Sequence, residues 1–89
     1  MKPRIAVIED DPDNRLLVQA LLEDLYQLTE YETGNAALEG LLDDKPDLVL
    51  LDISLPDIDG PEVLNWIRRQ EDLDTLPVVA LTAHAMAGD

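Results

Sequence analysis

The segment from residue 48 to residue 52, Leu-Val-Leu-Leu-Asp, is apolar at four consecutive positions and then ends on an acid. A strand that is apolar at every position is covered on both faces, which is typical of a parallel sheet between two layers of helices. Leu48–Leu51 is therefore predicted to be a central parallel strand. Asp52 then lies at the carboxyl end of this strand, the edge of an open parallel sheet where ligands bind.

The rest of the chain alternates between strand and helix patterns around this segment. Asp11-Pro12 predicts a helix start, because a capping side chain is followed by proline at the first helical position. Short connections between alternating elements favour right-handed crossovers and one α/β domain over residues 1–89. Further strands are predicted at Arg4–Ile8, Leu28–Tyr31 and Val78–Leu81, and helices from Pro12 to about Leu25, at Ala36–Leu42, at about Pro61–Gln70 and from Ala83.

Composition and charge exclude several classes of protein. The 89 residues carry a formal net charge of −14, which argues against nucleic-acid binding, since phosphate contacts need clustered Lys and Arg. No run of eighteen apolar residues is present, so no membrane span is predicted. The chain has no cysteine, and its first residues show no signal-peptide pattern, so we expect a cytoplasmic protein.

Polar side chains follow three of the four predicted strands. Glu9 and Asp10 end the first strand, Asp52 the third and Thr82 the fourth. If these strands are neighbours, the four side chains converge, and two carboxylates about 4 Å apart repel by about 4 kcal/mol at an effective dielectric near 20. Such a cluster needs a cation or a proton. Ligands that are all oxygen suit Mg²⁺ or Mn²⁺, and a carboxylate beside such a metal is equipped to attack a phosphoryl group.

The acids after the first strand have a simpler alternative interpretation. Glu9-Asp10-Asp11 could be a solvated loop that ends in a helix cap. Their combination with Asp52, at the end of a fully apolar strand, favours a metal site instead.

Three segments of the chain share one further pattern, and they are Val7–Asp11, Leu50–Gly60 and Pro77–Met86. Together these segments resemble the receiver domain of two-component response regulators. The specific part is the stretch Asp-x-x-Leu-Pro-x-x-Asp-Gly with a Glu-Asp pair upstream. The resemblance covers the whole chain and implies a flavodoxin-like, doubly wound parallel sheet with strand order 2-1-3-4.

The resemblance also implies roles for individual residues. Asp52 would accept a phosphoryl group from a histidine kinase or phosphotransfer protein. Asp10 and Asp52 would ligate Mg²⁺, with the Ser54 backbone carbonyl as a third ligand and Glu9 acting through water. Thr82 would be the switch hydroxyl that moves toward the phosphoryl group. The chain would then be a signalling switch that assists its own phosphoryl transfer, and not an enzyme for a small-molecule substrate.

The family's domain continues with a fifth strand, which ends in a lysine, and a fifth helix, and neither is found in these 89 residues. We therefore expect a receiver domain that is incomplete at its C-terminal end. Val78–Leu81 would form a bare sheet edge, which natural proteins avoid. This predicts self-association through the fourth strand and the chain end at Ala83–Asp89.

Two alternatives remain open. The chain could be a truncated half-fold that exists as an oligomer and signals nothing. It could also be an aspartyl-phosphate phosphatase of the haloacid dehalogenase type, but that chemistry wants a second acid two residues after the nucleophile, where this chain has Ser54.

Overall fold

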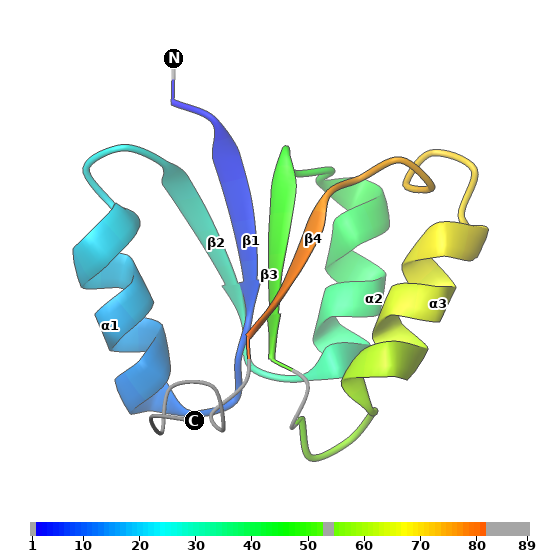
Figure 1. The fold of residues 1–89 in the computed structure, drawn as a ribbon, viewed down its shortest axis with the longest axis horizontal. Helices are drawn as coiled ribbons and strands as arrows, with labels where there is room; N and C mark the ends of the chain where they lie inside the picture. The colour runs from blue at the N-terminus through cyan, green and yellow to red at the C-terminus, as the bar shows by residue number, and fades with distance from the viewer. Residues whose placement is uncertain (1, 53–54, 82–89) are drawn as a thin grey trace.

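The computed structural model describes residues 2–52 and 55–81, which form one sheet of parallel strands with helices on both faces (Figure 1). The strand order is β2-β1-β3-β4, so the predicted doubly wound α/β fold with order 2-1-3-4 is confirmed. The strands are β1 (Arg4–Ile8), β2 (Gln27–Tyr31), β3 (Leu48–Asp52) and β4 (Val78–Leu81), and the helices are α1 (Pro12–Leu22), α2 (Gly34–Asp43) and α3 (Gly60–Arg69).

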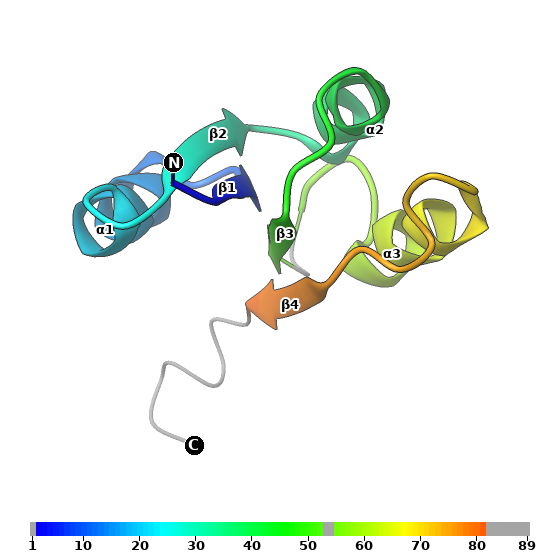
Figure 2. The same cartoon turned by 90° about the horizontal axis from the view of Figure 1, so that it is seen from above.

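The main hydrophobic core lies on the face of the sheet that α2 and α3 cover (Figure 2). Alternate residues of the two central strands point into it, as the two-residue period of a strand requires. The apolar side chains on one face of α2 and of α3 pack against these strand residues. The buried members of this core are Ala6, Ile8, Ala37, Leu41, Val49, Leu51, Leu55, Val63, Ile67, Leu73 and Leu76.

The opposite face of the sheet carries only α1 among the described residues (Figure 2). No residue of α1 is buried, and Leu17 and Leu21 are 46% and 67% exposed. On the sheet, Val79 of β4 is 46% exposed and pairs in register with Leu50, which is only half-buried. Within the described part of the chain, β4 pairs with β3 alone, so its other side is a sheet edge.

Two helix boundaries differ from the sequence prediction by two residues or more, each for a local reason. Helix α1 ends at Leu22 and not near Leu25, because the chain turns there so that the Gln27 amide can donate to the Pro3 carbonyl and begin β2. Helix α2 begins at Gly34, two residues earlier than predicted, because the Thr33 hydroxyl accepts a hydrogen bond from the Ala36 amide at 3.1 Å. No helix in the described ranges is long and apolar enough to span a membrane.

Candidate metal centre

Three acids meet at the carboxyl edge of the sheet because β1 and β3 are adjacent and in register. Ile8 pairs with Leu51, so Glu9 and Asp52, which follow them, leave the sheet side by side. Asp10 comes next, in the turn that leads into α1. One carboxylate oxygen from each of Glu9, Asp10 and Asp52 lies within 4.8 Å of the other two. This spacing could place all three around a single cation.

Glu9 is the most enclosed of the three acids. It is 3% exposed, and its buried Oε2 atom has no hydrogen-bond partner among the residues that the structure describes. The pKa of Glu9 is raised from 4.5 to about 7. Burial is the largest cause, followed by a hydrogen bond to Asp52 and the charges of Asp52 and Asp10, while a hydrogen bond with Asn14 acts in the opposite direction. The site therefore resists a full set of negative charges unless a cation balances them.

The donor set of this site fits a hard divalent cation. All three candidate ligands are carboxylates, which suit Mg²⁺ or Mn²⁺ and not metals that prefer sulfur or imidazole. The unpartnered, buried Oε2 of Glu9 is an acceptor that a metal-bound water could satisfy. The other two predicted site residues, Ser54 and Thr82, lie outside the described residues.

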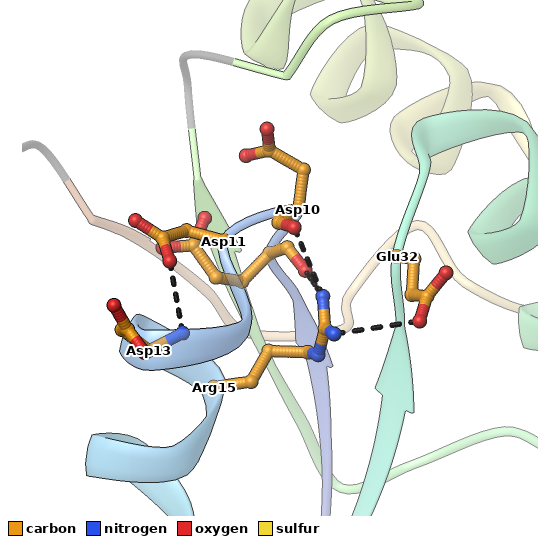
Figure 3. Close-up of polar contacts among 6 residues, drawn as sticks. Asp10, Asp11, Asp13, Arg15 and Glu32 are labelled. Atoms are coloured by element: carbon orange, nitrogen blue, oxygen red, sulfur yellow. Dashed lines mark hydrogen bonds and ion pairs between the residues drawn. The ribbon is translucent and has the colours of Figure 1, made fainter.

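The β1–α1 turn is held by contacts from the first turns of α1. Asp11 caps the helix, since its carboxylate accepts a hydrogen bond from the Asp13 amide at 2.8 Å, as its position before Pro12 predicted. Sequence reasoning did not single out Arg15. Its guanidinium donates to the carbonyl oxygens of Glu9 and Asp10 at 2.9 and 3.1 Å (Figure 3). A usable signal was its spacing, because a residue four positions after the cap lies on the same helix face.

Asp57 is a second residue that sequence reasoning did not single out. Its carboxylate accepts hydrogen bonds from the amides of Gly34 and Asn35 at 3.0 and 2.9 Å. These bonds lower the pKa of Asp57 below its usual value. An added side chain on Gly34 would lie 3.1 Å from the Cβ of Ile58, so the two segments approach closely. The loop between β3 and α3 is thereby fastened to the N-terminus of α2.

This chain has a doubly wound parallel sheet with acids at the carboxyl ends of β1 and β3. These features are typical of α/β proteins that bind a ligand at that edge of the sheet. Comparison with known families is more specific. The model of the response regulator receiver domain matches residues 5–89. The chain therefore belongs to the receiver domain family of two-component signalling, as the sequence motifs predicted.

Known relatives of this chain include a response regulator and a much longer sensor protein. The polar-differentiation response regulator DivK of Brucella abortus (strain 2308) is 38% identical over 90 residues, which cover all of this chain and 73% of DivK. The sensor protein GacS of Pseudomonas syringae pv. syringae is 43% identical over 91 residues, but this chain spans only 10% of its length. Among solved structures, the receiver domain of the sensor histidine kinase PA1611 from Pseudomonas aeruginosa PAO1 holds a magnesium ion in its active-site cleft. It is 34% identical, with a TM-score of 0.89 and coverage of 100% of this chain and 74% of that one.

Proposed function

We propose that this chain is a phosphorylation-dependent signalling switch in which Asp52 accepts a phosphoryl group from a histidine kinase or phosphotransfer protein. The observation that carries the proposal is the meeting of Glu9, Asp10 and Asp52 within 4.8 Å, with Glu9 and Asp52 buried. The family and the magnesium-bound relative support Mg²⁺, or Mn²⁺ in its place, as the cation. The Ser54 backbone carbonyl would complete the ligand set.

The transfer can be written atom by atom. An oxygen of the ionised Asp52 carboxylate attacks the phosphorus of a phosphohistidine, the P–N bond breaks, and an acyl phosphate forms while the histidine nitrogen keeps the electron pair and takes up a proton. The bound cation would neutralise charge on the phosphoryl oxygens. The Thr82 hydroxyl would then move toward the phosphoryl group. The chain assists its own modification and turns over no small-molecule substrate, and we place this role in the cytoplasm.

Labelling with a small-molecule phosphodonor tests this function. Incubation with carbamoyl phosphate and Mg²⁺ should add one phosphoryl group, detected by intact-protein mass spectrometry, and the adduct should be released by hydroxylamine as an acyl phosphate. An Asp52→Asn variant and removal of Mg²⁺ by a chelator should each abolish the label. A stable phosphoryl group on the Asp52→Asn variant would show that Asp52 is not the acceptor and would contradict the proposal. No label on the parent chain would also contradict it and would leave the non-signalling half-fold.

Self-association is the second part of this proposal. Among the described residues, the outer edge of β4 has unpaired backbone groups. Val79 of β4 and the leucines of α1 add exposed apolar surface. A second copy could cover them by pairing β4 across a two-fold axis, with the chain end at Ala83–Asp89 taking part. Sedimentation velocity should show a dimer or larger species at micromolar concentration. A well-folded monomer under these conditions would refute this part alone.

A further inference from the structure

Arg15 joins three elements at the edge of the candidate metal centre. It lies on α1, yet its Nη1 reaches back to the carbonyl oxygens of Glu9 and Asp10 at 2.9 and 3.1 Å. Its Nη2 lies 3.3 Å from Oε1 of Glu32, the residue that follows β2. The Arg15 side chain is only 15% exposed, whereas that of Glu32 is 75% exposed. Figure 3 shows the guanidinium between the β1–α1 turn and Glu32.

The two carbonyls that Arg15 holds belong to the residues that carry two of the three clustered carboxylates. The sheet fixes the backbone that leaves β1 as far as Glu9, whose amide donates a hydrogen bond to the Tyr31 carbonyl at 3.0 Å. From Asp11 onward the backbone is fixed by helix α1, because the Asp11 carbonyl accepts a hydrogen bond from the Arg15 amide at 3.0 Å. Between these points the chain must turn, and the Arg15 guanidinium holds both carbonyls of that turn from one atom.

We infer that Arg15 is a positioning residue for the metal centre: it holds the backbone of Glu9 and Asp10 so that their carboxylates stay beside Asp52. This inference rests on the cation site of the proposed function. Partners that orient metal ligands from outside the ligand set are worth about 10- to 100-fold in metal affinity. When Arg15 is replaced by a neutral residue, a positioning role predicts weaker metal binding. The loss of its charge alone predicts stronger metal binding, because a guanidinium near the site repels a cation.

Binding of Mn²⁺ alone, followed by electron paramagnetic resonance of the free ion, separates these two roles. Arg15→Gln removes both the charge and the paired hydrogen bonds. Positioning predicts that its Mn²⁺ affinity falls by about tenfold or more. A charge effect alone predicts tighter binding. Arg69→Gln is the matched control, because Arg69 is exposed in the last turn of α3 and its loss removes the same charge without touching the β1–α1 turn.

Two further variants keep the test decisive. Arg15→Lys keeps the charge but not the planar fork, so its affinity should fall between the parent and Arg15→Gln, even if the glutamine variant folds poorly. Glu32→Gln removes only an exposed ion pair, and its Mn²⁺ affinity should stay within about threefold of the parent. An equal loss in Glu32→Gln and Arg15→Gln would overturn the assignment to the two carbonyls.

The outcomes distinguish this inference from the proposed function. If the parent binds Mn²⁺ and folded Arg15→Gln binds it equally well or more tightly, the positioning role is wrong and the metal site stands. A merely structural role would lower the free energy of unfolding of Arg15→Gln without changing the Mn²⁺ affinity of the folded protein. If the parent binds no Mn²⁺, the cation site fails and this inference fails with it.

Discussion

Replacing Glu9 by glutamine should stabilise the metal-free protein at alkaline pH. The pKa of Glu9 is raised from 4.5 to about 7 in the folded state, first by burial and then by its hydrogen bond to Asp52. Because each unit of pKa is worth about 1.4 kcal/mol, ionised Glu9 costs the folded state up to about 3 kcal/mol. Glutamine has nearly the same shape and carries no charge. The free energy of unfolding of Glu9→Gln should therefore exceed that of the parent by up to this amount at pH 8.

The pH dependence of this difference follows from the direction of the pKa shift. Below pH 4.5 Glu9 is protonated in the folded and the unfolded chain, so the penalty is absent. Between pH 4.5 and 7 the unfolded chain releases the proton first, and the parent loses stability as the pH rises. The advantage of Glu9→Gln should therefore be small at pH 4, grow up to pH 7 and stay constant above it.

Urea denaturation followed by circular dichroism at pH 4 and pH 8, in the presence of a chelator, measures this difference. Glu71→Gln is a suitable control, because Glu71 is exposed and lies after α3, far along the chain from the acidic cluster. Added Mg²⁺ should reduce the advantage, since it stabilises the parent in proportion to its binding. A Glu9→Gln variant that is less stable than the parent at pH 8 without metal would refute the reasoning.

Two further variants test the contacts of helix α2 with its neighbours. Asp57→Ala should lower the urea midpoint at pH 7, because the amides of Gly34 and Asn35 lose their acceptor. Since the pKa of Asp57 is lowered in the folded state, this contribution is present above its ordinary value of 3.8 and is lost as the pH falls through the lower folded-state pKa, so the difference between the parent and the variant should shrink in acid. Gly40→Ala should destabilise by about 1–3 kcal/mol despite alanine's higher helix propensity, because its Cβ would overlap the Tyr31 ring. Thermal unfolding of Gly40→Ala combined with Tyr31→Leu should show recovery, and an additive loss in that double variant would contradict this packing argument.

The fold and the meeting of the acids could be predicted because both depend on local pattern and simple topology. A strand that is apolar at every position, such as Leu48–Leu51, implies a covered parallel strand, and adjacent parallel strands bring their carboxyl ends together. The predicted bounds of β1 and β4 agree with the structure residue for residue. Glu9, Asp10 and Asp52 needed only this topology to be placed near one another.

The contacts that hold the turns could not be predicted, because they join residues whose separation in sequence carries no periodic signal. Asp57 receives its hydrogen bonds from amides 22 and 23 positions earlier. Arg68, in the last turn of α3, donates to the carbonyl oxygens of Asp74 and Leu76 and holds the segment before β4. A long cationic side chain finds free carbonyls only once the fold has brought them within reach.

The three acids of the metal centre are held by supports of different strength. Asp52 ends a strand whose neighbours Val49 and Leu51 are fully buried in the core, so its position is as stable as the sheet. Asp10 lies in a turn that depends on the hydrogen bonds of Asp11 and Arg15, and α1 itself buries no residue. A hydrogen bond of this kind contributes only about 1 kcal/mol, far less than a packed strand.

The turn should consequently open more readily than β3, since segments with few buried contacts open at a lower free energy than the core. Repulsion among the three carboxylates acts in the same direction, because it pushes the less firmly held Asp10 away from buried Glu9 and Asp52. A cation that binds all three acids removes that repulsion and ties the turn to the sheet. Metal binding would therefore act first on the β1–α1 turn and the start of α1, and it would change the central strand least.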